Sequence, residues 1–144
     1  MEIVCNQGEL NNAIQLVSKA VATRPTHPIL ANILITADEV TKKVSLTGFD
    51  LNLGIQTSFD ASVNKSGAIT IPSKLLSEIV NKLPNESPVS IIVQELADNI
   101  LIKSDRGSFN LKGLVSDDYP KLPFVESGTS LDVNPNSLLK ALKM

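Results

Sequence analysis

One order of strands and helices recurs along this chain, and it restricts the possible fold more than any other feature. An extended apolar segment is followed by an amphipathic helix and then by three further extended segments, and this βαβββ order occurs twice. The opening strands begin near residues 2 and 67, and a third start near residue 130 keeps the spacing at roughly 63–65 residues. The repeat predicts an α+β fold in which similar units place their helices on one face of antiparallel sheets.

The first unit is predicted to begin with a strand over Glu2–Asn6. A helix over Gly8–Val21 follows, because its apolar residues fall at helical spacing, and Arg24-Pro25-Thr26-His27-Pro28 ends it, since proline cannot continue a helix. The three remaining strands are expected at Ile29–Ala37, Lys43–Thr47 and Leu51–Phe59.

The second unit repeats this order with the same kinds of segment. Its elements are expected at Ala68–Ile71 (strand), Ser73–Leu83 (helix), and Val89–Gln94, Ile100–Lys103 and Ser108–Leu111 (strands).

A third unit is predicted to open with a strand at Ser130–Val133 and a helix at Ser137–Met144. We therefore expect one complete domain over residues 1–122, and over residues 123–144 a linker with the first strand and helix of a truncated second domain. A helix of about eight residues is marginal in water, so we expect residues 126–144 to be loosely held. The alternative is that this tail packs on the domain as a terminal helix.

Composition excludes a protein that coats nucleic acid by bulk positive charge. The formal charge is −2, and four Phe, one Tyr and no Trp cannot build a base-stacking platform. The three predicted helices nevertheless hold five lysines against two glutamates, Glu9 and Glu78, while the remainder holds eight basic and thirteen acidic residues. Basic helix faces suit phosphate contacts without sequence specificity. The alternative is that these lysines only make the helix surface soluble.

No motif of an enzyme or a metal site stands out. The single Cys5 cannot form an internal disulfide, and pairing it with His27 as a thiol–imidazole dyad lacks a third residue. Ser137-Leu138-Leu139-Lys140 fits the S-x-x-K pattern of serine acyl enzymes, but the companion elements are missing or out of order. We expect a non-enzyme that needs no cofactor or metal, and a soluble, cytoplasmic protein because no signal or membrane segment is evident.

Four segments together resemble one protein family. They are Arg24-Pro25-Thr26-His27-Pro28-Ile29-Leu30, Leu46-Thr47-Gly48-Phe49-Asp50-Leu51, Ile71-Pro72-Ser73-Lys74-Leu75 and Asp118-Tyr119-Pro120-Lys121-Leu122-Pro123. In order and spacing they resemble the bacterial sliding clamps, the beta subunits of DNA polymerase III. The resemblance implies the DNA-clamp fold, with two βαβββ units in each domain, helices lining a central hole and curved antiparallel sheets outside.

The same resemblance implies functional residues. The implied DNA contacts are Arg24 and Ser73, the possible DNA-facing helix residues are Lys19, Lys82, Lys140 and Lys143, and the implied subunit interface is Lys74, Arg106, Phe109 and Leu111. Other readings stay open: Arg24 as a loop-stabilising residue, Ser73 as a helix N-cap, and Phe109 and Leu111 as core, since alternation places both on one strand face.

The resemblance also implies partners. A full-length clamp would form a homodimeric ring around duplex DNA and serve as a processivity factor, binding DNA polymerase III and the clamp loader. The present chain alone is expected to be a monomer that binds DNA weakly and in a salt-sensitive way. The competing hypothesis is a stand-alone α+β module that binds another protein through the strand carrying Phe109 and Leu111.

Overall fold

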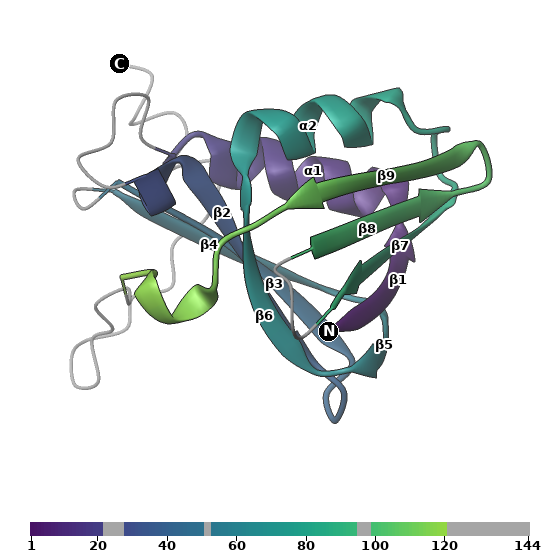
Figure 1. Ribbon diagram of the computed structural model, residues 1–144, viewed down its shortest axis with the longest axis horizontal. Helices are drawn as coiled ribbons and strands as arrows, with labels where there is room; N and C mark the ends of the chain where they lie inside the picture. The colour runs from purple at the N-terminus through teal and green to yellow at the C-terminus, as the bar shows by residue number, and fades with distance from the viewer. Residues whose placement is uncertain (22–27, 51–52, 95–98, 121–144) are drawn as a thin grey trace, which may run out of the picture.

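The computed structural model describes residues 1–21, 28–50, 53–94 and 99–120. In chain order the elements are β1 (Glu2–Asn6), α1 (Gln7–Ser18), the 3-10 turn η1 (Pro28–Ala31), β2 (Asn32–Asp38), β3 (Lys43–Phe49), β4 (Gly54–Asp60), β5 (Ser62–Lys65), β6 (Gly67–Pro72), α2 (Ser73–Lys82), β7 (Pro88–Val93), β8 (Asn99–Ser104), β9 (Gly107–Lys112) and the 3-10 turn η2 (Ser116–Asp118). The two α-helices lie side by side over the strands (Figure 1).

The strands form two antiparallel sheets, and each sheet contains strands of both repeat units. The five-stranded sheet has the order β5-β1-β7-β8-β9, and the four-stranded sheet has the order β4-β3-β2-β6. The opening strand β1 pairs with β7 of the second unit, placing Ile3 opposite Ile91, while β6 pairs with β2 of the first unit. The two units predicted from the repeat are therefore interlocked, and neither completes a sheet without the other.

Both sheets and both helices share one main core. Fully buried side chains from each contribute to it, including Ile14 of α1, Leu76 of α2, Ile35 of β2 and Ile91 of β7. Burial of such aliphatic side chains is the main favourable term in folding, with each contributing about 1.5–3 kcal/mol. This arrangement is the α+β fold with helices on one face that the sequence predicted.

Two differences from the predicted elements concern the end of α1 and the start of β2. Residues 28–31 form η1 rather than the start of a strand, because Pro28 has no N–H for a strand ladder, and Ile29 and Leu30 are buried in a second, smaller cluster. Helix α1 ends at Ser18, not at Val21. The Ser18 hydroxyl donates to the Ile14 carbonyl at 2.6 Å. The amides of Ala20 and Val21 then donate to carbonyls three residues earlier, as in a 3-10 turn, which is typical of a helix end.

Strand β5 was not predicted from the sequence. It has four residues, only one of which, Val63, is apolar and buried, so it shows no alternating pattern. Val63 lies opposite Ile3 on β1, and this pairing is what makes the segment a strand. The predicted third repeat, at Ser130–Val133 and Ser137–Met144, lies outside the described residues.

Gly48 on β3 allows α1 to lie directly against the sheet. A β-carbon at this position would collide with the carbonyl oxygen of Val17 and press on the side chain of Val21. Because the obstacle is backbone, it cannot be relieved by a change of rotamer.

We therefore predict that Gly48→Ala lowers the free energy of unfolding by about 2 kcal/mol or more, in the upper range of overpacking changes. Urea unfolding followed by circular dichroism would measure it. Ser58→Ala, on the neighbouring strand β4 and exposed, is the control and should change stability by less than about 0.5 kcal/mol. Equal stability of the two variants would contradict the close approach of helix and strand.

Candidate nucleic-acid interface

The two helices contact each other through a row of polar side chains, which we term the helix seam. It comprises Gln7, Gln15 and Ser18 of α1 with Ser73, Ser77 and the Val80 carbonyl of α2. Gln7 donates to the Val80 carbonyl at 2.9 Å, and Gln15 donates to the Ser77 hydroxyl at 3.1 Å. Residue numbers rise along α1 as they fall along α2, so the helices run antiparallel.

Ser73 lies inside this seam, and the expectation that it caps α2 is wrong. Pro72 occupies the N-cap position and Ser73 is the first helical residue, with no side-chain cap. The reason is that strand β6 runs directly into α2, leaving Pro72 as the last extended residue. The N-terminal amides of α2 therefore receive no side-chain oxygen from this position.

The hydroxyl proton of Ser73 is also already engaged. Ser73 is 7% exposed, and its Oγ lies 3.1 Å from Ser18 Oγ. Since Ser18 uses its one proton on the Ile14 carbonyl, Ser73 must be the donor in the serine pair. A phosphate oxygen accepts hydrogen bonds only, so this arrangement leaves Ser73 no proton for a phosphate.

The lysines predicted to face DNA occupy the exposed sides of the helices. Lys82 in the last turn of α2 and Lys19 just after α1 are exposed, as is Lys74 in the first turn of α2. Glu9 and Glu78 are exposed on the same two helices, so this part of the surface carries one net positive charge. The other predicted DNA-facing residues, Arg24, Lys140 and Lys143, lie outside the described residues.

Strand β9 forms one edge of the five-stranded sheet. Phe109 lies opposite Ile102, and Leu111 lies opposite Ile100, which confirms that both share one strand face. Leu111 is 8% exposed and belongs to the main core, which favours the alternative that it is a core residue. Phe109 is 37% exposed.

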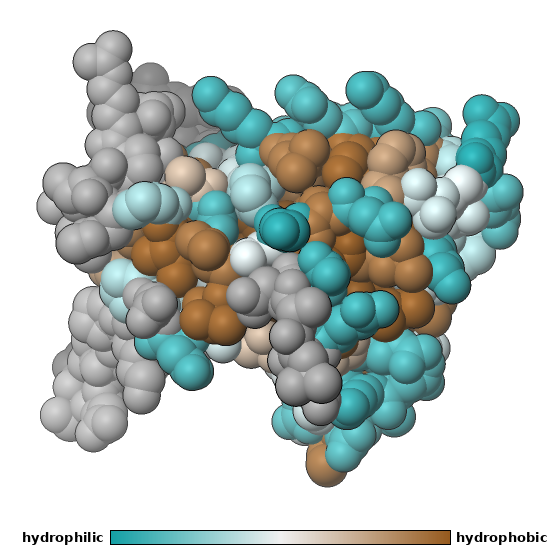
Figure 2. Space-filling view, in the orientation of Figure 1, coloured by the Kyte–Doolittle hydropathy of each residue, from teal (hydrophilic) through white to brown (hydrophobic). Residues whose placement is uncertain are grey.

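An exposed apolar area follows α2 and β9. Figure 2 shows apolar residues gathered where these two elements lie in Figure 1. Leu75 on α2 and Phe109 on β9 are 39% and 37% exposed. Lys74 is exposed on the same helix, and Arg106 is exposed in the turn between β8 and β9. Three of the four predicted interface residues are therefore at the surface: Lys74 on α2, Arg106 in the turn between β8 and β9, and Phe109 on β9.

Comparison with known proteins identifies the family. Residues 1–123 match the family model described as DNA polymerase III beta subunit, N-terminal domain. The chain belongs to this family. Among curated relatives, the beta sliding clamp of Synechococcus elongatus is 47% identical over 143 residues, which is 99% of this chain and 38% of that protein.

Solved structures agree with this assignment. The sliding clamp of Caulobacter crescentus superimposes with a TM-score of 0.91 at 30% identity, and that of Bacillus subtilis with 0.89 at 35% identity. Each comparison covers 99% of this chain and 38% of the other. The clamp fold predicted from the resemblance is confirmed, and the chain spans about two fifths of the length of these relatives.

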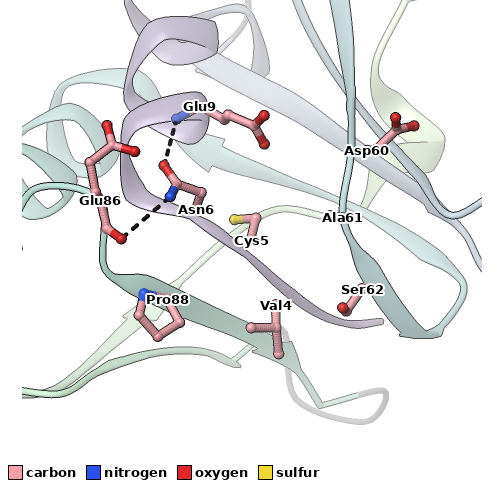
Figure 3. A pocket seen from close by; sticks show the side chains of 9 residues that line it. All are labelled: Val4, Cys5, Asn6, Glu9, Asp60, Ala61, Ser62, Glu86 and Pro88. Carbon is pink, nitrogen blue, oxygen red and sulfur yellow. Dashed lines mark hydrogen bonds between the residues drawn. The ribbon is translucent and has the colours of Figure 1, made fainter.

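A shallow hollow of about 490 Å³ lies beside the junction of β1 and α1 in this clamp chain (Figure 3). Its lining is Val4, Cys5, Asn6, Glu9, Asp60, Ala61, Ser62, Glu86 and Pro88. The Asn6 side chain accepts hydrogen bonds from the Gly8 and Glu9 amides and donates to the Glu86 carbonyl, so it is engaged in holding the helix end. No group of three metal-ligating side chains occurs in the part of the chain that the structure describes.

Cys5 is a buried thiol rather than a nucleophile. Burial, with the nearby negative charge of Glu9, raises the pKa of Cys5 from 9.0 to about 12, so the thiol is protonated at neutral pH. Its hypothetical partner in a thiol–imidazole dyad, His27, lies outside the described residues.

Within the described ranges, no helix has the length and apolar character needed to span a bilayer.

The raised pKa of Cys5 predicts a loss of stability at alkaline pH. A thiol that titrates higher in the folded than in the unfolded chain stabilises fully below pH 9, and this contribution is lost as pH rises towards 12. The slope approaches about 1.4 kcal/mol per pH unit for one group. Urea unfolding at pH 8, 9.5 and 11 should show a shallower decline for Cys5→Ala than for the parent chain. Parallel declines would contradict the assignment.

Proposed function

We propose that this chain supplies part of a DNA sliding clamp, a ring that encircles duplex DNA and keeps the replicative polymerase on its template. The observation that supports this most directly is the pair of antiparallel helices on one side of two sheets, in an arrangement that matches solved clamps over 99% of the chain. In a ring of such units the helices face the hole and the sheets form the rim. The role is mechanical, so we propose no catalytic function.

The proposed DNA-facing surface is the outer side of α1 and α2. Lys19 and Lys82 would contact phosphates there, together with Arg24, Lys140 and Lys143. Contacts of this kind carry no sequence information, because base edges are not read. In this proposal Ser73 belongs to the helix seam and does not contact DNA. The backbone amides in the first turn of α2, which have no side-chain cap, would face the phosphates instead, together with Lys74.

The proposed subunit interface is the area formed by α2 and β9. Phe109 supplies an apolar anchor at the sheet edge, and Lys74 and Arg106 supply charges near it, while Leu111 supports the strand from the core. In the full-length homodimeric ring this edge would meet the neighbouring subunit. DNA polymerase III and the clamp loader would bind the full-length protein, in the cytoplasm.

We propose the domain division at residue 122, with residues 123–144 opening a second clamp domain. The repeat spacing of roughly 63–65 residues supports it, since a third opening strand and helix are predicted after that point. Alone, the 144-residue chain would be a monomer.

A second candidate is a stand-alone module that binds a partner protein. The exposed Phe109 on β9, the edge strand of its sheet, favours it as well, because an unpaired edge strand with an exposed apolar side chain suits strand addition. The two hypotheses differ in whether this edge joins clamp subunits, and a chimaera can distinguish them.

A chimaera in which this chain replaces the matching region of the Synechococcus elongatus clamp should form a dimer. It should stay on nicked circular DNA and be lost when the DNA is linearised, because a ring holds DNA by enclosure. Light scattering and gel filtration with each DNA would measure this. A chimaera that folds but neither dimerises nor stays on circular DNA would contradict the clamp proposal and favour the stand-alone module.

The matched variants Phe109→Ser and Leu111→Ser separate interface from core in that chimaera. Phe109→Ser should abolish dimerisation with little change in the thermal unfolding of the domain. Leu111→Ser should lower domain stability by about 2–4 kcal/mol, because it places a hydroxyl in the core. Unfolding of the Phe109→Ser variant would show that Phe109, too, belongs to the core.

The chain alone should bind duplex DNA weakly and in a salt-dependent way. NMR titration at about 20 mM salt should shift amides on the exposed sides of α1 and α2, and the shifts should vanish near 150 mM salt. Lys82→Gln should reduce the slope of affinity against salt by about one, whereas Lys43→Gln, which removes the same charge on β3, should leave it unchanged. Sub-micromolar affinity at 150 mM salt would contradict the proposal.

A further inference from the structure

The internal repeat gives the domain two equivalent edge strands. Strand β4 ends the four-stranded sheet and β9 ends the five-stranded sheet, and each is the last of the three strands that follow the helix of its repeat unit. Within the described strands, both are paired on one side only. An unpaired strand edge is a template for pairing with another strand. The edge at β9 has a proposed partner, and the edge at β4 has none.

A hollow of about 230 Å³ lies between α1 and β4. Its walls are one side of α1 and three consecutive residues of β4, namely Glu9, Asn12, Ala13 and Leu16, and Thr57, Ser58 and Phe59. Leu16 is 43% exposed, and Phe59 is partly buried against the main core. A cavity of about 150 Å³ already accepts benzene, so this α1/β4 hollow has room for a phenyl ring.

Phe109 of β9 is a phenyl side chain in a matching position. It is 37% exposed and lies opposite the buried Ile102, on the core-facing side of its sheet. Phe59 of β4 lies opposite the buried Val44, on the core-facing side of the other sheet. Side chains alternate between the two faces of a sheet. Pairing β9 of one copy with β4 of another would therefore place Phe109 on the face that carries the hollow.

The two edges also carry opposite charge. Helix α1 and strand β4 have two acids and no base, which are Glu9 and Asp60. Helix α2 and strand β9 have three bases and one acid, which are Lys74, Lys82, Lys112 and Glu78. All of these residues are exposed, and Asp60 lies 3.9 Å from Lys43 of β3. Glu9 forms part of the hollow itself, so a basic partner is favoured there.

We propose that the α1/β4 hollow receives Phe109 of a second copy of this chain, while β9 of that copy pairs with the free edge of β4. The two surfaces in contact are different, so the contact is head to tail and leaves one surface of each kind free at the ends of a dimer. The inference rests on the proposed function in one respect: it uses the area of α2 and β9 proposed there as the subunit interface, and it names the kind of surface that this area fits.

The contact is expected to be weak. It consists of strands of six and seven residues and one aromatic anchor. Contacts at the low end of protein interface size bind weakly, so we expect a dissociation constant of about 1 mM. The chain therefore remains a monomer at micromolar concentration. Covalent linkage of such units raises their effective concentration to about the millimolar range, where contacts of this strength form.

The test is complementation between two variants, each of which lacks one surface. Phe109→Ser removes the ring and keeps the hollow, whereas Leu16→Arg fills the hollow with a long cationic side chain and keeps the ring. Val40→Arg is the control, because Val40 is 86% exposed in the turn between β2 and β3 and lines neither surface. Urea unfolding shows whether each variant is folded. Where Phe109→Ser is not, Phe109→Thr, which suits a strand, takes its place.

The mixed pair should associate although neither variant associates with itself. When ¹⁵N-labelled Phe109→Ser is titrated with unlabelled Leu16→Arg, NMR should show saturable shifts of α1 and β4 amides, with a dissociation constant of about 1 mM. With the labels exchanged, the shifts should lie on α2 and β9. Each of the two variants added to itself should give no shifts, whereas Val40→Arg added to itself should give both sets, because it keeps both surfaces.

Two results would overturn the inference. Absence of shifts in the mixed titration of folded variants would show that the α1/β4 hollow does not receive β9 and that its occupant has another chemistry. Equal shifts when Phe109→Ser is added to itself would show that the contact does not use the ring.

The chimaera with the Synechococcus elongatus clamp separates this inference from the proposed function. If the chimaera dimerises and the mixed pair does not associate, the clamp proposal stands and this inference alone fails. If the mixed pair associates and the folded chimaera does not dimerise, the inference stands and the clamp proposal fails.

Discussion

The rest of the structure depends on the exchange of opening strands between the two repeat units. Strand β1 completes the sheet of β7, β8 and β9, and β6 completes the sheet of β2, β3 and β4. The backbone N–H and C=O groups of a strand need hydrogen-bond partners. Each half of the domain by itself would therefore have an unpaired strand edge and an exposed core. The domain therefore folds as one unit, even though its sequence consists of two similar parts.

This exchange also decides where the helices lie. Each helix follows its opening strand without a loop, at Asn6–Gln7 and at Pro72–Ser73, so exchanged strands place the two helices beside each other. The contact between them is polar, with Gln15 bonded to Ser77 and Ser18 to Ser73. The exposed sides of the helices carry Lys19, Lys74 and Lys82 as well as Glu9 and Glu78, a mixed charge that would suit a surface lying near phosphates without binding any one of them tightly.

The second core adds a link that the repeat does not require. It is the smaller of the two apolar clusters, and it joins η1, the end of β3 and the residue after η2 through Ile29, Leu30, Phe49 and Tyr119.

The sequence by itself determined the kinds of element, their order and the repeat, because helical and alternating apolar patterns are local properties of the chain. It also placed Phe109 and Leu111 on one strand face, since alternation requires it. Only the tertiary structure decided that Leu111 is covered while Phe109 is exposed, since burial depends on what packs above a strand face. It likewise decided that Val63 lies in a strand, that Pro28–Ala31 forms a turn, and that the Ser73 hydroxyl is hydrogen-bonded to that of Ser18. The strand at Val63, the burial of Ile29 and Leu30 in that turn, and the Ser18–Ser73 contact each depend on a partner distant in sequence, and no local pattern encodes such a partner.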